Sequence, residues 1–157
     1  MEPDPQHRRA LSLAYDFLAG RQRSEAEMRA YLRRWDIEDA TADDTVAALA
    51  RQGLLDDRSF AAAWTESRLS SRPRSRRLLH RERRGKGVDD EIASEATQAV
   101  DDESTATELA RRRAHVLCGL DRGTAVRRLS DYLLRRGFDG DTVRRAVRDA
   151  LSGDDDS

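Results

Sequence analysis

Two adjacent aspartates, Asp56 and Asp57, have the residue type and the spacing that could do chemistry. A pair of carboxylates can act as general acid and base, or can provide half of a metal site. The pair stands shortly before Phe60 and Trp64, whose four-residue separation predicts one face of a helix. An aspartate in front of a helix accepts hydrogen bonds from the free amides of the first turn. We therefore expect Asp57 to cap this helix rather than to catalyse a reaction.

Other acidic pairs occupy the same kind of position. Asp89 and Asp90 precede a predicted helix, and so do Asp139 and Asp141, which flank one glycine. Three acidic pairs at three helix starts favour capping over catalysis as their shared role.

Few other residues could do chemistry. His7, His80 and His115 have no second histidine, cysteine or carboxylate at a convincing metal-ligand spacing, and Cys118 is the only cysteine. A single cysteine excludes an intramolecular disulfide and a cysteine-based zinc site. Neither a P-loop nor a dinucleotide-type glycine fingerprint occurs. We therefore expect no catalytic residue, no metal site and no cofactor, in a protein that is not an enzyme.

The elements that position these residues are predicted to be helical throughout. Apolar residues recur three and four positions apart in nine segments, and no segment alternates with the two-residue period of a strand. Residues 76–92 and 127–143 share one plan: an arginine-rich helix, a glycine, one apolar residue, an acidic cap and a new helix. In the first third, residues 35–37 stand at the corresponding turn without a glycine, and a longer loop is expected through Thr45. Such repetition is typical of a tandem helical array.

The prediction is therefore an all-α protein of three tandem three-helix repeats, forming an elongated, curved, right-handed array. Charged residues make up 38% of the 157 residues, well above the usual quarter, which suits an elongated helical protein with much charged surface. The predicted parts are a disordered N-terminus at 1–7, repeats at 8–54, 55–101 and 102–151, and an acidic disordered tail at 152–157.

A basic block in the middle of the chain is the strongest candidate surface. Between Arg68 and Gly87, nine cations are opposed only by Glu82, whereas residues 89–104 carry seven acids and no base. An anionic partner, either phosphate or an acidic protein groove, would relieve the repulsion among these cations. The simpler alternative is a solvated helix face balanced by the acidic block that follows. The candidate partner-binding residues are Arg68, Arg72, Arg74, Arg76, Arg77, Arg81, Arg84 and Lys86.

The sequence also bears on the compartment. It contains no apolar run of about 18 residues, the length that a membrane span needs. Its N-terminus lacks the apolar core of a secretory signal. We expect a cytoplasmic protein.

Several of these residues resemble the signature of the RecX family, bacterial regulators of the RecA recombinase. The similarity spans roughly residues 10–151, and the central motif is its most specific part. The residues that carry it are Gly53-Leu54-Leu55-Asp56-Asp57, Phe60-Ala61, Trp64 and Arg68, with the Lys86-Gly87-Val88 turn, the Ser24-Glu25 helix start and the Arg135-Arg136-Gly137-Phe138 turn.

The resemblance implies binding along the groove of the RecA–DNA filament. It further implies modulation, usually inhibition, of the ATPase, strand-exchange and coprotease activities of RecA. The expected partner is the RecA filament, with single- or double-stranded DNA as a further candidate, and we expect a monomer. One departure is Arg83, which stands where the third repeat has Leu133 and the family usually has an apolar residue. We therefore expect that helix to be less deeply buried, or shifted.

A second hypothesis is direct, non-sequence-specific DNA binding without RecA. It predicts binding to DNA alone that weakens steeply with salt. The formal net charge of −1 and the acidic segments 89–104 and 154–156 disfavour it.

Overall fold

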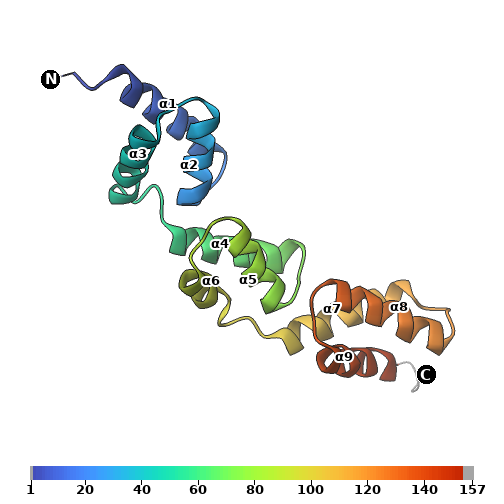
Figure 1. The fold of residues 1–157 in the computed structure, drawn as a ribbon. Helices are drawn as coiled ribbons and strands as arrows, with labels where there is room; N and C mark the ends of the chain where they lie inside the picture. Colours follow the sequence, from blue (N-terminus) through green and yellow to red (C-terminus); the bar gives the residue numbers. More distant parts are fainter. Residues whose placement is uncertain (1, 154–157) are drawn as a thin grey trace. The chain divides into compact units, whose positions relative to one another are not determined.

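The computed structural model describes residues 2–153, which form nine α-helices and no strand (Figure 1). The helices follow one another in three sets of three. This confirms the predicted all-α fold of three tandem three-helix repeats. They are α1 (Pro5–Gly20), α2 (Glu25–Arg34), α3 (Asp39–Arg51), α4 (Asp57–Ser71), α5 (Arg76–Gly85), α6 (Asp90–Thr97), α7 (Asp102–Val116), α8 (Arg122–Arg135) and α9 (Gly140–Ser152).

The first repeat, α1 to α3, combines a capped helix start with a well-filled core. At the start of α2, the Glu27 amide donates to Ser24 Oγ at 3.1 Å, and the Ser24 amide donates to the Glu27 carboxylate at 3.2 Å. This reciprocal capping box satisfies two amides that the helix itself leaves free. Met28, Leu32 and Leu49 are fully buried in the core behind it.

Two helices of this repeat begin earlier than the sequence predicts. The first, α1, begins at Pro5, because Asp4 accepts from the Gln6 amide at 3.2 Å and proline suits a first helical turn. Residues 5–7 are therefore helical, which corrects the expectation of disorder there. Likewise α3 begins at Asp39, so the expected longer loop is wrong. Thr45 lies buried inside α3, where its hydroxyl donates to the Thr41 carbonyl at 2.8 Å.

The start of α4 corrects the capping prediction by one residue. Asp56, and not Asp57, is the cap: its carboxylate accepts from the amides of Arg58 at 3.0 Å and Ser59 at 3.2 Å. Asp57 is already the first helical residue, and its side chain contacts another helix, as described below.

The third repeat, α7 to α9, is capped by an aspartate at every helix start. Asp101, Asp121 and Asp139 each accept a hydrogen bond from an amide of the first turn. The role predicted for Asp139 is thus confirmed, and its bonds from the amide and hydroxyl of Thr142 lower its pKa. Leu129 is fully buried in the core beneath these caps. Helix α9 ends at Ser152, so this residue is helical, which corrects the expectation that the disordered tail begins there. Gly153 follows the helix, and residues 154–157 of the predicted tail lie outside the described residues.

The middle repeat, α4 to α6, has a smaller core built from Phe60, Ala61, Val88 and Ala93. Arg83 is fully buried beside it, and its Nε donates to the Ala61 carbonyl at 3.3 Å. The expectation that this arginine would make its helix less deeply buried is therefore wrong at this position. The guanidinium is accommodated inside the repeat.

The second helix of every repeat ends in the same left-handed turn. The left-handed residue is Asp36, Gly87 or Gly137, with φ of 59°, 77° and 89°. The amide after it donates to a carbonyl of the last helical turn: Ile37 to Leu32 at 3.1 Å, Val88 to Arg83 at 3.2 Å and Phe138 to Leu133 at 3.4 Å. The first repeat therefore makes the turn without glycine. Arg83 occupies the position that a buried leucine, Leu32 or Leu133, holds in the other two repeats.

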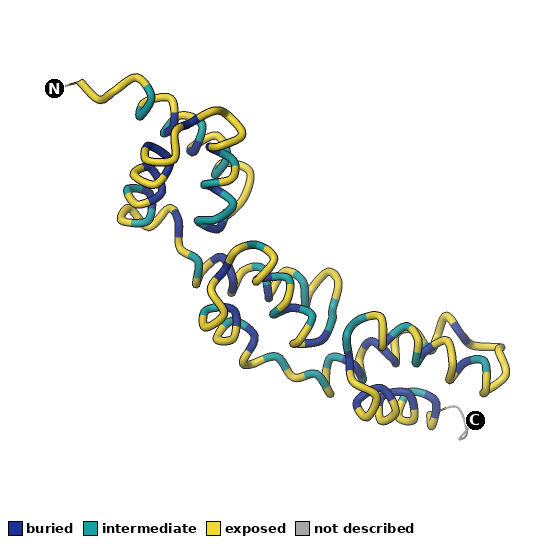
Figure 2. Tube along the Cα trace, in the orientation of Figure 1, coloured by how far each residue is buried: buried dark blue, intermediate teal, exposed yellow. Residues whose placement is uncertain are grey.

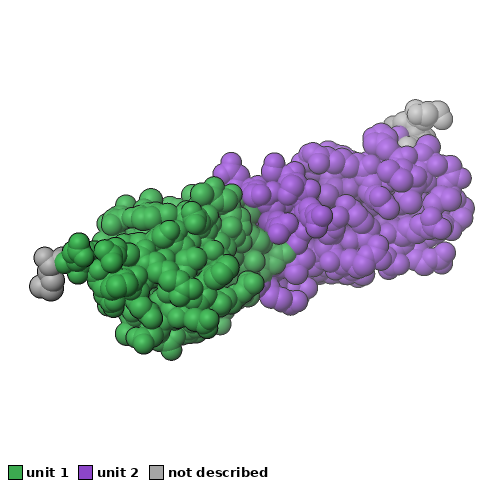
Figure 3. Space-filling model, turned by 90° about the horizontal axis from the view of Figure 1, so that it is seen from above, with its two compact units in different colours: residues 1–64, 82–96 green, residues 65–81, 97–157 purple. Residues whose placement is uncertain are grey.

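The buried residues form stripes on one side of each helix, as the spacing of apolar residues predicts (Figure 2). The chain divides into two compact units (Figure 3): Met1–Trp64 with Glu82–Ala96, and Thr65–Arg81 with Thr97–Ser157. Helices α4, α5 and α6 therefore contribute residues to both units. Within the described part of the chain, no helix has the length and apolar character that crossing a membrane requires.

Candidate partner-binding surface

The eight predicted partner-binding residues fall into two groups. Six of them, from Arg68 to Arg81, belong to the second unit, while Arg84 and Lys86 belong to the first. The group in the second unit contains four exposed residues, Arg72, Arg76, Arg77 and Arg81, and two half-buried ones, Arg68 and Arg74.

Arg84 and Lys86 already have acidic partners inside the protein. Arg84 pairs with Asp90 at 3.7 Å, and Lys86 Nζ lies 3.4 Å from the Glu27 carboxylate. The ammonium of Lys86 also lies 5.1 Å from the centre of the Trp64 ring. A cation held in this way is less available to a partner than a free one.

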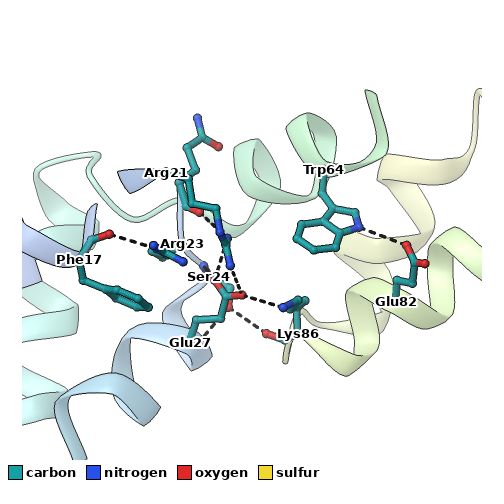
Figure 4. A network of polar contacts seen from close by, with 9 residues as sticks. Phe17, Arg21, Arg23, Ser24, Glu27, Trp64, Glu82 and Lys86 are labelled. Atoms are coloured by element: carbon teal, nitrogen blue, oxygen red, sulfur yellow. Dashed lines mark hydrogen bonds and ion pairs between the residues drawn. The ribbon is translucent and has the colours of Figure 1, made fainter. Parts of the chain in front are cut away.

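Lys86 is part of what we call the first joint, where the start of α2 meets the turn after α5 (Figure 4). Ser24 Oγ donates to the Lys86 carbonyl at 2.8 Å. The Glu27 carboxylate also receives two hydrogen bonds from the Arg21 guanidinium, at 3.0 and 3.2 Å. Gly87 is required at this joint, because a Cβ there would lie only 2.3 Å from Ala26 Cβ.

Glu27 is the charged centre of the first joint. Its partial burial would by itself raise its pKa, but the bonds from Arg21 and the Ser24 amide, together with the charge of Lys86, lower the pKa overall. Glu27 is therefore an anion that two cations share, and the first joint is electrostatically satisfied.

The motif residues Asp57 and Trp64 also serve this joint. Asp57 accepts from the Glu25 amide at 2.9 Å, so it caps α2 of the preceding repeat rather than its own helix. The Trp64 indole donates to Glu82 at 3.3 Å, and the Arg21 guanidinium lies 5.8 Å from its ring centre. Both residues stand out in the sequence, and the structure gives them a packing role.

The second joint lies in the second unit, where the start of α5 meets the turn after α8. Ser75 caps α5 through the Leu78 amide at 3.1 Å, and the Ser75 amide donates to the Arg136 carbonyl at 2.9 Å. A Cβ on Gly137 would lie 2.4 Å from Ser75 Oγ, so this turn also requires glycine.

Two arginines hold the second joint together through backbone carbonyls. Arg77 Nη2 donates to the Gly137 carbonyl at 3.2 Å. Arg136 Nη1 donates in the opposite direction, to the Pro73 carbonyl at 3.1 Å. Each side of the joint therefore donates one guanidinium hydrogen bond to a backbone carbonyl of the other side.

Two arginines lie against an aromatic ring at the second joint. The guanidinium carbons of Arg113 and Arg136 lie 5.2 and 4.9 Å from the centre of the Tyr132 ring. Arg113, Tyr132 and Arg136 are not among the binding residues predicted from the sequence. The signal that could have found Arg136 is its place before a turn glycine, which matches that of Lys86.

Fold and surface together define a class: an α-helical repeat protein. Its three-helix repeats meet through capped joints that require glycine, and exposed arginines lie near the second joint. The chain belongs to the RecX family. Its three-helix domains match those described as the first, second and third three-helix domains of RecX, at residues 10–49, 56–96 and 101–147 respectively.

Individual relatives agree with this assignment. The regulatory protein RecX of Amycolatopsis mediterranei is 36% identical over 154 residues, covering 96% of this chain and 88% of the relative. That of Prosthecochloris aestuarii is 34% identical, covering 95% of this chain and 98% of the relative. The crystal structure of RecX from Lactobacillus salivarius has the same fold, with a TM-score of 0.80, 19% identity and coverage of 92% of this chain and 96% of that one.

Proposed function

We propose that this protein is a non-catalytic regulator that binds the RecA nucleoprotein filament in its helical groove and inhibits RecA. The inhibited activities would be ATP hydrolysis, strand exchange and coprotease activity, which would place the protein in DNA repair, homologous recombination and the SOS response. Its membership of a family of regulatory proteins supports this proposal.

The observation that links the proposal to particular residues is that some arginines of the second unit make no ion pair within the described residues. Arg72 and Arg81 are exposed and make no ion pair within the described part of the chain. Arg77 meets a carbonyl, which has no formal charge. Exposed guanidiniums without an internal counter-ion suit an anionic partner, because the fork of N–H donors fits carboxylate and phosphate alike. The remaining predicted residues contribute less where they are already paired, as Arg84 and Lys86 are.

In this proposal the protein acts by occupying the groove of the filament and not by catalysing a reaction. A protein that contacts neighbouring RecA subunits at once would restrain the subunit motions that accompany ATP hydrolysis, and would obstruct the addition of further subunits. Several modest contacts spread over repeats add to a firm attachment when they form together.

The test is the DNA-dependent ATPase activity of RecA with this protein titrated in. We expect hydrolysis to fall as the protein approaches stoichiometric amounts with the filament. An unchanged rate at several-fold excess would exclude inhibition. Increased hydrolysis would show that the protein stimulates RecA. Binding to DNA alone, with a strong salt dependence and without an effect on RecA, would favour the DNA-binding hypothesis instead.

A further inference from the structure

We infer that the second joint is a receptor for a carboxylate that an acidic segment of the protein partner supplies. This inference rests on the proposed function, since the segment would belong to the recombinase filament. It adds the site, the ligand group and the residue whose charge distinguishes the second joint from the first.

The two joints have the same construction. In each, a buried serine caps the second helix of one repeat through the amide three residues later: Ser24 with Glu27, and Ser75 with Leu78, both at 3.1 Å. In each, the same serine donates to the carbonyl of the residue before a turn glycine. The Ser24 hydroxyl donates to Lys86 at the first joint, and the Ser75 amide donates to Arg136 at the second. The first joint therefore serves as an internal template for the second.

The joints differ in the charge of the third residue after the cap. At the first joint the third residue after the cap is Glu27, and its carboxylate neutralises Lys86 and Arg21. At the second joint the corresponding residue is Leu78, which has no charge. The cation before the glycine has been kept, as Arg136, while the anion that balances it in the template is missing.

No other carboxylate replaces it among the described residues. Arg136 donates to the Pro73 carbonyl and lies against Tyr132, whereas Arg77 donates to the Gly137 carbonyl. Arg113 lies against the same Tyr132 ring and makes no ion pair within residues 2–153. Three positive charges therefore meet at this joint without a counter-ion among residues 2–153.

These guanidiniums are also prepared for a ligand. A guanidinium has five N–H donors, and the carbonyl bonds described above use one donor each of Arg77 and Arg136. The bonds to carbonyls and the contact with the Tyr132 ring fix the side chains, so that less conformational entropy is lost when an anion binds. The first joint shows that the group that fits such a site is a carboxylate, which a guanidinium fork can grip with two parallel bonds.

The surroundings favour a single carboxylate over the continuous polyanion of nucleic acid. Asp102 lies at the edge of the joint, where it accepts from the Arg76 amide at 2.7 Å, and Asp131 is exposed on α8 next to Tyr132 in sequence. A phosphate backbone passing through the joint would meet these acids on its way. One acidic side chain, with an apolar neighbour against Leu78, would not.

The decisive variant is Leu78→Glu, which copies the carboxylate of the first joint into the second. We expect it to occupy Arg136 from inside and so to weaken binding to preformed RecA filaments at least about tenfold, measured by fluorescence anisotropy. Its melting temperature should stay equal to that of the natural protein or rise, because a new ion pair forms. Loss of binding without loss of stability is a result that a merely disrupted fold does not give.

The matched control is Leu78→Gln, which has nearly the shape of glutamate and no charge. It should bind filaments within about twofold of the natural protein, because the receptor arginines stay free. Glu27→Gln provides the reverse control at the first joint: it should lower stability and leave filament binding in place. Equal binding by Leu78→Glu and Leu78→Gln would overturn the inference.

Two further probes separate this inference from the proposed function. A labelled peptide that carries one glutamate next to a leucine tests the joint without any filament, and Leu78→Glu should weaken its binding whereas Leu78→Gln should not. If the natural protein leaves the RecA ATPase unchanged while the peptide result holds, the proposed function fails and the receptor stands. If Leu78→Glu abolishes binding of a short single-stranded DNA and spares the peptide, the anion is phosphate and the inference is wrong.

Discussion

At the scale of single residues, a buried arginine is the most unusual feature of the protein. Arg83 takes the place that fully buried leucines, Leu32 and Leu133, hold in the other two repeats. Removing a charge from water is costly, and the polar interactions that form inside a protein often only offset that cost. The guanidinium also lies 5.9 Å from the centre of the Trp64 ring, which links the core of the middle repeat to the first joint.

Arg83→Leu is therefore expected to keep or raise the stability of the protein, by up to about 2 kcal/mol, because it restores the apolar residue of the other repeats. Thermal unfolding followed by circular dichroism measures the change. Arg83→Ala is the control and should cost about 2–4 kcal/mol, since it removes both the polar interactions and the volume. If the Arg83→Leu variant were as unstable as the Arg83→Ala variant, the polar interactions of the natural arginine would be needed for folding.

The ionised Glu27 leads to a prediction about pH. Its pKa is lowered in the folded protein, so it contributes stability that is present above its ordinary value near 4.5 and is lost as the pH falls through the lowered folded value. The natural protein should therefore lose stability on acidification more steeply than Glu27→Gln. Urea unfolding between neutral pH and about pH 3 measures the difference, which should be largest at neutral pH and vanish in acid. A constant difference between the two proteins at all pH values would contradict the assignment.

At the scale of elements, the joints explain which turns need glycine. Gly87 and Gly137 lie against the cap of the preceding repeat, where a Cβ would collide, whereas Asp36 has no preceding repeat and keeps a side chain in the same turn. Glycine is thus required twice over at the joints, for its positive φ and for its lack of a Cβ.

Gly53 separates these two requirements, because its φ is +76° but a Cβ there would meet nothing within 4 Å. We expect Gly53→Ala to cost about 1 kcal/mol from backbone strain alone. Gly87→Ala has nearly the same φ, and should cost about 1–3 kcal/mol more, since its Cβ must displace Ala26. Equal losses in thermal unfolding would mean that the first joint opens at little cost.

Helix content and turns could be predicted from the sequence, because apolar spacing, glycine stops and acidic caps act over a few residues. The placing of Asp57 and Lys86 could not. Both serve contacts with the preceding repeat, and nothing in their local sequence indicates that Glu25 and Glu27 are their partners. For the same reason a run of cations that looks uniform in sequence divides into paired and unpaired members once the chain has folded.

At the scale of the whole molecule, the formal net charge of −1 conceals which cations are available. Many arginines pair internally, as Arg111 does with Asp149 at 2.8 Å, while Arg72 and Arg81 do not pair within the described residues. Long-range attraction to any anionic partner depends on the unpaired ones, so a count of all basic residues overstates the surface that a partner meets.

Under the proposed function, Arg72→Glu together with Arg81→Glu should therefore raise the concentration needed to inhibit the RecA ATPase about tenfold or more, without a change in the circular dichroism spectrum. Arg34→Glu with Arg51→Glu is the matched control, since both residues are exposed and unpaired in the described chain and lie outside the basic block. That control makes the same change in net charge. Equal weakening by both double variants would show that total charge, rather than this surface, governs binding.

The separation of the joint residues bears on how the protein is made. Ser24 meets the Lys86 carbonyl across 62 positions, so everything that the first joint needs has been synthesised once residue 88 has left the ribosome. The first joint can then close while the third repeat is still being translated. Each new repeat would find a finished neighbour to fold against, and the newborn chain would never have to search its whole length for a partner.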